Sequence, residues 1–465
     1  MIIPLTLNLR SNPARYGVAG AARLINAYAE QIGAEGKTPH AVWGVDGFTL
    51  FSTPPNDAKV RAMLAVSDTE LLVVAGRLLY RIDPSGTSTL VGGIASDGLT
   101  TMARNRAAPN PQVAIVSGGI YYGYQGGLVS KLSDPDLPPP VSVAALNGYF
   151  SFFLADGRHF SSGIDDFGVE ALDFATAEAN PDGGLRNFVR GQDLLFFGPR
   201  STEFWRDVGG DPYPFARTTV KDYGLLAADS VADVDQTTVF VAHDGTVRIL
   251  NGYDAERIST HAVERAIADD TSPADIEACS WQSRGHTFYA ISGATFSWVW
   301  DRTTGFWHER KSYGLDRWRI SKAVQYGSRI VVGDYANSKL YTMSETAYDE
   351  NGDPLVMQVQ FAPTHAFPYR LAFNSLYVDA VPGVGLVSGT DHIANPAMMI
   401  DYSDDGGKTW STQRTEPLGA ASQDLVRVKT TRLGASANRT FRIGISAAVA
   451  RGIMGANVDV QKLRA

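Results

Sequence analysis

Cysteine is almost absent from the sequence. The one cysteine, Cys279, cannot form a disulfide within the chain, which excludes a disulfide-stapled secreted fold. No histidine motif adjoins it, so we expect a small buried apolar side chain rather than a reactive thiol. The eight histidines show no zinc-ligand spacing, and we expect no metal-binding residues.

Long apolar runs are absent as well. No stretch reaches the roughly 18 apolar residues that a membrane-spanning helix needs, so we expect no membrane insertion. Residues 1–9 are apolar but short and lack a basic start, so we do not expect a signal peptide.

Basic residues are fewer than acidic residues, and the charge is unevenly distributed along the chain. The net charge of −8 argues against a general nucleic-acid binder. Residues 411–465 nevertheless carry nine basic and three acidic residues, a net charge of +6, which leaves −14 for residues 1–410. This basic end predicts either a solvated strand face or a surface that meets an acidic partner or a neighbouring subunit. Its basic residues are Arg414, Arg427, Lys429, Arg432, Arg439, Arg442, Arg451, Lys462 and Arg464.

The signature motifs of enzymes are missing. No G-x-S-x-G elbow, Walker loop or dinucleotide fingerprint occurs, and the Gly-rich turn at residues 182–184 neither follows a clear strand nor opens a clear helix. We therefore expect no catalytic residues, no cofactor-binding residues and no cofactor. His286 and His308 lie near aromatic strands, where a structural role is expected rather than a catalytic base.

Pairs of adjacent acids are the one feature that could indicate glycosidase carboxylates. They occur in turn-rich stretches, where acids are usually solvated, and sequence does not show whether distant carboxylates converge. The pairs are Asp165 with Asp166, Asp269 with Asp270, and Asp404 with Asp405.

Turn formers and strand formers are abundant. The 465 residues, enough for two or three domains, include 46 glycines and 23 prolines, and 10% are aromatic. A hairpin pattern recurs: an apolar β-rich run, a turn with Gly or Asp, then a second apolar or aromatic run. The turn centres lie near residues 76, 118, 157, 198, 244, 293 and 333.

This spacing, about 39 to 49 residues, is typical of β-propeller blades, which have four short strands each. One blade cannot bury both its faces, so blades pack around an axis. The pattern predicts an all-β fold with a propeller-like body of about six or seven blades. An ordinary series of hairpins in a β-sandwich is the alternative. Residues 259–268 are the best helix candidate, capped by Ser259 or Thr260.

Three domains follow from the pattern. Residues 1–50 are predicted to be an N-terminal arm or first strand, residues 51–345 the propeller body, and residues 346–465 a C-terminal β-sandwich. A polar, turn-rich stretch at 345–354 forms the linker between the last two. Strict alternation at residues 426–429 and 441–445 is typical of half-buried strands.

Residues 403–410 (SDDGGKTW) fit the Asp-box pattern S-x-D-x-G-x-T-W, a structural turn of sialidase propellers. The motif occurs once, outside the propeller-like repeat. We therefore expect an ordinary hairpin turn in the C-terminal domain.

Several segments, in order and spacing, resemble a known family: the packaged-DNA-stabilisation, or tail-hub, proteins of short-tailed bacteriophages. The resemblance covers about residues 20–345 and departs from the family at Ala27 and Ala29. The segments are residues 24–28 (LINAY), 36–38 (GKT), 44–48 (GVDGF), 257–264 (RISTHAVE), 285–289 (GHTFY), 305–310 (GFWHER), 318–319 (WR) and 333–334 (GD).

The resemblance implies a non-enzymatic virion protein of the phage tail, assembled in the cytoplasm of the bacterial host. It implies a homo-hexamer, a hub or nozzle below the portal and its adaptor ring, that helps retain packaged DNA and forms part of the exit channel. Partners would be a tailspike or tail fibre, a needle or plug, and passing DNA bound without sequence specificity. Two alternatives stay open: a sialidase-like propeller glycosidase, and a stand-alone carbohydrate- or host-binding propeller.

Overall fold

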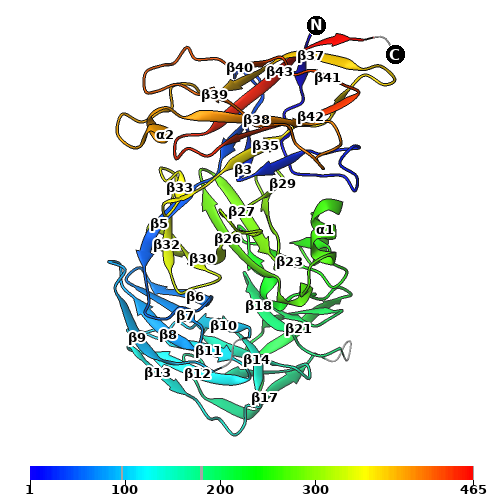
Figure 1. The fold of residues 1–465 in the computed structure, drawn as a ribbon. Coiled ribbons are helices and arrows are strands. Elements are labelled where there is room, and N and C mark those ends of the chain that lie inside the picture. Colours follow the sequence, from blue (N-terminus) through cyan, green and yellow to red (C-terminus); the bar gives the residue numbers. More distant parts are fainter. Residues whose placement is uncertain (96–97, 178–181, 464–465) are drawn as a thin grey trace.

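The computed structural model describes residues 1–95, 98–177 and 182–463, and within them the chain forms a β-propeller and a β-sandwich (Figure 1). The propeller occupies the lower part of Figure 1 and the sandwich the upper part, where both termini lie. The predicted all-β fold class, a propeller body with a C-terminal β-sandwich, is confirmed.

The first four blades follow one another along the chain, each as a separate four-stranded antiparallel sheet. Their strands are β6 (Val60–Ser67), β7 (Glu70–Ala75), β8 (Leu78–Ile82) and β9 (Ser88–Gly93); β10 (Thr100–Arg104), β11 (Val113–Ser117), β12 (Ile120–Gln125) and β13 (Leu128–Lys131); β14 (Pro140–Leu146), β15 (Tyr149–Leu154), β16 (Arg158–Ser162) and β17 (Val169–Thr176); and β18 (Arg186–Arg190), β19 (Asp193–Phe197), β20 (Thr202–Asp207) and β21 (Phe215–Lys221).

Three further blades bring the number in the described residues to seven. The sixth and seventh share their sheets with additional strands. The strands are β22 (Ala232–Asp233), β23 (Thr238–Val241), β24 (Val247–Asn251) and β25 (Asp254–Arg257); β26 (Glu277–Ser283), β27 (His286–Ser292), β28 (Ser297–Asp301) and β29 (Phe306–Glu309); and β30 (Ile320–Tyr326), β31 (Arg329–Asp334), β32 (Leu340–Ser344) and β5 (Gly47–Ser52).

Apolar clusters between neighbouring blades hold the ring together. Each of seven clusters joins two adjacent blades, and one of them joins the seventh blade to the first through Val331 and Leu340 against Leu71 and Val73. The first strands of most neighbouring blades contact one another and surround the axis. Burial between blades therefore supplies most of the core of the propeller.

The predicted hairpins are the pairs formed by the second and third strands of the blades. Six predicted turn centres lie between the paired strands. The seventh is displaced, because β31 continues through Gly333 to Asp334 and the turn falls on residues 335–339. The predicted helix is confirmed as α1 (His261–Ala268), with Thr260 as its N-cap.

The ring is closed by a strand from the N-terminal part of the chain. β5 pairs antiparallel with β32 and becomes the outermost strand of the seventh blade. At the inner end of the same blade, the Ser321 hydroxyl lies 2.9 Å from the carbonyl oxygen of Val60 in the first blade. The seventh blade is thus tied to the start of the propeller at both edges.

The sandwich consists of two sheets around one apolar core. One sheet runs in the order β3 (Ala27–Gln31), β4 (His40–Gly44), β43 (Gly452–Lys462), β37 (Leu371–Ala380) and β40 (Val428–Thr431), with β1 (Ile2–Leu5) on β43 and β41 (Ala435–Ser436) on β37. The other contains β2 (Arg23–Ile25), β35 (Met357–Gln360), β42 (Asn438–Ile445), β38 (Ala397–Ser403) and β39 (Arg414–Pro417), with β36 (Thr364–His365) on β42.

Short elements complete the described chain. They are η1 (Ala228–Ser230), η2 (Pro273–Asp275), α2 (Asp391–Ala394), β33 (Asp349–Glu350) and β34 (Asp353–Pro354). None of the helices among the described residues is long and apolar enough to span a membrane.

Residues 1–50, expected as an arm or first strand, are built into both parts of the molecule. β1, β3 and β4 pair within one sandwich sheet, and β2 pairs within the other. The expected boundary at residue 50 falls inside β5. β1, β2 and β4 pair with strands that lie more than 300 residues later, a pairing that local sequence patterns do not encode.

A substitution of Phe48 tests how much the closing strand β5 contributes to stability. Its side chain is fully buried between the sixth and seventh blades, with its ring centroid 4.7 Å from that of Tyr341. We expect Phe48→Ala to lower the free energy of unfolding by about 3–5 kcal/mol, because it leaves a cavity at the closure. Leu50→Ala in the same strand, where the side chain is half exposed, should cost far less. Denaturant unfolding of both variants measures the difference; equal costs would contradict a closing role for β5.

Candidate functional site

A cavity of about 420 Å³ lies at the axis of the propeller. Its walls come from the first strands of the first four blades, β6, β10, β14 and β18, together with residues of η1, β26 and β30. Five charged side chains line it, and four of them are basic: Arg61, Arg104, Arg186, Lys322 and Asp229. The charge of this cavity is thus opposite in sign to the net charge of the chain.

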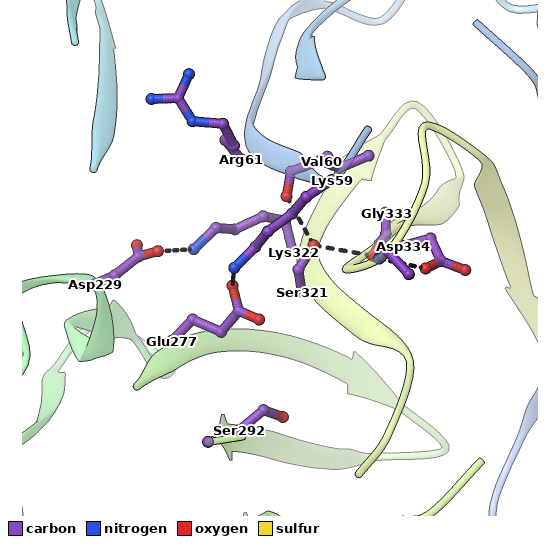
Figure 2. A network of polar contacts seen from close by, with 12 residues as sticks. Lys59, Val60, Arg61, Asp229, Glu277, Ser292, Ser321, Lys322, Gly333 and Asp334 are labelled. Carbon is purple, nitrogen blue, oxygen red and sulfur yellow. Dashed lines mark hydrogen bonds and ion pairs between the residues drawn. The ribbon is translucent and has the colours of Figure 1, made fainter. Parts of the chain in front are cut away.

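Asp229 is shared by two cations. The Lys322 amine of the seventh blade lies 2.7 Å from the Asp229 carboxylate of η1, beside the fifth blade (Figure 2). A guanidinium nitrogen of Arg186 in the fourth blade lies 3.6 Å from the other carboxylate oxygen. Burial lowers the pKa of Arg186, and the charge of Asp229 counteracts this effect. Through Asp229 these contacts link the fourth and the seventh blades, which are not neighbours in the ring.

Glu277 holds a second pair of cations. Its buried carboxylate lies 2.7 Å from the Lys59 amine (Figure 2). It also lies 2.7 Å from a guanidinium nitrogen of Arg317. Arg317 also donates to the carbonyl oxygen of Gly293 at 3.0 Å, and its guanidinium lies over the Tyr335 ring. Ion pairs of this kind are costly to desolvate, and their fixed geometry favours one arrangement of the blades.

The axial site offers charge and hydrogen bonds rather than a nucleophile. Its described charged residues are amines, guanidinium groups and two carboxylates, each carboxylate already bound by two cations. Sequence reasoning missed this site, because its residues lie on different blades and come together only in the closed ring. Basic residues in the first strands of three blades, Arg61, Arg104 and Arg186, were the available signal.

The junction between propeller and sandwich is a second candidate site. β2 pairs in parallel with β29 of the sixth blade and antiparallel with β35 of the sandwich, so one ten-stranded sheet runs through both domains. The Arg23 guanidinium forms an ion pair with Glu309 at this point, and the Ser11 hydroxyl donates to the same carboxylate at 3.0 Å. The two domains are therefore joined by backbone hydrogen bonds as well as by the chain.

Asn26, which follows β2, binds two distant segments of the chain at once. Its side-chain amide donates to the carbonyl oxygens of Lys311 at 2.8 Å and Val356 at 3.0 Å, and its carbonyl oxygen accepts from the Lys311 amide at 3.0 Å. The residue is buried and has a φ of 53°, a conformation that Asn tolerates better than most residues.

Replacement of Asn26 should weaken the junction. Asn26→Ala leaves buried backbone groups without partners and strains the left-handed backbone, and we expect a loss of about 3 kcal/mol or more in the free energy of unfolding. Asn26→Gly keeps the backbone unstrained and loses only the amide contacts, so it should be less damaging by roughly 1 kcal/mol. Chemical unfolding tests both; costs below 1 kcal/mol for both would show that Asn26 does not secure the junction.

Buried arginines reinforce the junction. The Arg310 guanidinium lies 4.3 Å from the Trp318 ring centroid and donates to the carbonyl oxygen of Asp46. Arg451 donates to the carbonyl oxygens of Leu355 and Val45. Burial lowers the pKa of both arginines to about 10.

His286 and His308, expected as structural histidines, both lie buried in the sixth blade. His286 Nδ1 lies 2.8 Å from the Asp301 carboxylate, and its ring meets the Tyr28 ring of the sandwich edge-on at 5.1 Å. The bond to Asp301 raises the pKa of His286. Burial lowers the pKa of His308 to about 3, so His308 is neutral at physiological pH.

The raised pKa of His286 makes stability depend on pH. The folded state favours the charged form of His286, so this histidine stabilises the fold. Its contribution to the free energy of unfolding is complete below pH 6.5 and is lost as the pH rises through the raised pKa. The stability difference between the wild type and His286→Gln should therefore be larger at pH 6 than at pH 9. Unfolding at the two pH values measures it, with His365→Gln at an exposed site as the control. A difference that does not change with pH would contradict a charged pair.

The acid pairs lie in three separate turns. Asp165 accepts a hydrogen bond from the Arg106 amide, and Asp269 is the C-cap of α1. Asp404 forms an ion pair with buried Arg439. Asp405, in the Asp-box turn, accepts hydrogen bonds from Thr409 and from Ser403, which lower its pKa. The expected hairpin turn is confirmed, since β38 and β39 pair on either side of it.

Fewer basic residues of the C-terminal segment 411–465 are exposed than the sequence indicated. Arg439 and Arg451 are buried, and Arg442 is bound to Asp401 beneath the Trp410 ring. Arg427, Lys429 and Arg432 are exposed on and beside β40, while Arg464 lies outside the described residues. The exposed basic surface is therefore smaller than predicted, because Arg439, Arg442 and Arg451 are buried or paired within the fold.

Cys279 is buried between the sixth and seventh blades, as expected for an apolar side chain. Burial raises the pKa of its thiol to about 12, so little thiolate forms at neutral pH. The described residues contain no cluster of His, Cys, Asp and Glu side chains that could hold a metal ion.

Two family models match the chain in order. Residues 48–348 match the model described as "Bacteriophage P22 Gp10, beta-propeller", and residues 364–461 match "Bacteriophage P22 Gp10, beta-sandwich". The two matches coincide with the propeller and the sandwich of the structure. No curated protein matches the sequence.

Solved propellers show only a loose likeness. The WD40 propeller domain of Doa1 is 13% identical, with 64% of this chain and 97% of that chain covered and a TM-score of 0.43. Virginiamycin B lyase from Staphylococcus aureus is 10% identical, with 64% and 98% covered and a TM-score of 0.46. A streptogramin B lyase is 11% identical, with 64% and 97% covered and a TM-score of 0.45. No function is inferred from these likenesses.

Proposed function

The chain belongs to the bacteriophage P22 Gp10 family and is therefore a structural protein of the phage tail, and we propose that it is a subunit of the tail hub. In this role it forms a homo-hexameric ring below the portal and its adaptor, helps retain packaged DNA, and anchors a tailspike or fibre and a needle or plug. The observation that carries the proposal is the match of both domains, in order, to the two models of one family.

The construction of the chain supports a mechanical role. Closure of the propeller by β5, and the sheet shared through β2, unite both domains into one hydrogen-bonded body. A subunit of a ring that holds DNA under pressure needs such continuity, because a freely hinged domain would yield under load. Non-enzymatic function agrees with the axial carboxylates, which are already bound by cations.

A DNA channel would lie between subunits rather than along the propeller axis. The axial cavity holds about 420 Å³ and is crossed by the contact of Lys322 with Asp229, so it is too small to pass a duplex. An assembled ring provides the required width. The charge of −14 on residues 1–410 supports an acidic channel wall along which DNA slides without sequence-specific binding. A basic wall in the assembled ring would contradict this part of the proposal.

The glycosidase alternative is not favoured. The Asp box occurs once and lies in the sandwich, and the acid pairs lie in three separate turns. The stand-alone binding propeller also gains no support, since the family covers the sandwich as well as the propeller.

Loss of the protein from the phage should release packaged DNA. We expect particles made without this gene to fill their heads and then lose nuclease-resistant DNA, and a plasmid copy to restore retention. Leu50→Ala, at a half-exposed site, should complement fully, and Phe48→Ala should complement poorly. Nuclease-resistant DNA per particle is the measurement.

Assembly gives the second test. Native mass measurement should show a defined ring, six copies in our proposal, when the purified chain is mixed with portal and adaptor complexes. Such a subunit can remain monomeric alone, so the partner must be present. A chain that stays monomeric in the presence of the adaptor would contradict the hub role. Particles that lack this protein and still retain their DNA would contradict it as well.

A further inference from the structure

The axial cavity has more positive charge than its own carboxylate can balance. Arg104, Arg186 and Lys322 line it together with one acid, Asp229. Arg186 and Lys322 share that acid, and Arg104 donates to the neutral carbonyl group of Val66. The Lys322 and Arg186 side chains are only 13% and 15% exposed, so water screens their charges incompletely.

One donor in this cluster has no partner. Arg186 Nε is buried and makes no hydrogen bond, although Nη1 of the same guanidinium donates to the Ala228 carbonyl oxygen at 2.7 Å and lies 3.6 Å from the Asp229 carboxylate. A buried donor without an acceptor is costly, and an ordered water or a bound ion is the kind of group that satisfies it. The cavity of about 420 Å³ has room for a small ion with its waters.

We propose that the axial cavity binds a small free oxyanion of the phosphate or sulfate class between Arg186, Lys322 and Arg104. Two guanidinium groups and an amine are the donors that recognise such anions, by forked hydrogen bonds and by charge. The site is independent of the tail-hub role, since it is formed within one propeller. The anion completes the ion-pair network across the axis and stabilises the closed ring.

Asp229 competes with the anion for the same cations. Its carboxylate already takes one hydrogen bond from the Lys322 amine at 2.7 Å (Figure 2). Removal of this acid frees both cations, so the anion should bind more tightly although the protein without anion becomes less stable. A purely structural network would lose stability with Asp229 and gain no affinity.

Isothermal titration of the full-length protein with inorganic phosphate, and separately with sulfate, tests the site at an ionic strength held constant with sodium chloride. Both anions stabilise many proteins without binding, so saturation at one site per chain is the readout rather than a rise in melting temperature. We expect one saturable site in the wild type. Lys322→Gln should weaken binding at least tenfold, and Asp229→Asn should strengthen it severalfold.

Lys339→Gln is the matched control, since Lys339 is an exposed lysine of the same blade, in the turn between β31 and β32. It should leave the affinity unchanged. Circular dichroism and gel filtration establish that each variant is folded before titration. Absence of a saturable site in the folded wild type would overturn the proposal, as would equal effects of the two lysine variants or weaker binding by Asp229→Asn. A single-stranded oligonucleotide that displaces phosphate and binds more tightly would overturn the assignment to a free anion.

Discussion

Closure of the ring is the constraint on which the rest of the structure depends. Each blade buries its faces only against its neighbours, so the first and last blades must also meet. Here the outer strand of the last blade, β5, comes from the N-terminal part of the chain and pairs with β32. The strands before β5 belong to the sandwich, and the chain returns there after β34. The same closure that completes the propeller therefore ties the two domains together.

Charged groups concentrate where sheets from different blades or domains meet. At the axis, Asp229 and Glu277 each bind two cations from other blades. At the junction, Arg310 and Arg451 donate to the carbonyl oxygens of Asp46 and Leu355, where the chain passes between the two domains. Such groups gain little net stability from burial, but their geometry tolerates few alternative packings. They serve to align the blades and the sandwich in one arrangement.

Much of the fold was open to prediction because it is local. The seven hairpins, α1 with its Thr260 cap, and the Asp-box turn all depend on residues a few positions apart. The positions of β2 and β5 were not predictable, since each pairs with strands more than about 280 residues away. Asn26 belongs to a segment that the family resemblance singled out, yet its contacts with Lys311 and Val356 required the folded chain.

The sequence by itself determined the class of the protein: alternating apolar runs and turn residues specify blades, and the family segments specify a phage tail protein. Only the tertiary structure decided how many blades close the ring and which residues line the axial cavity. It also decided which sheets the strands of residues 1–50 join. The physical reason is the range of the interactions. Turn and strand preferences act between near neighbours, whereas Lys322 meets Asp229, and β5 meets β32, only after the blades have closed around the axis.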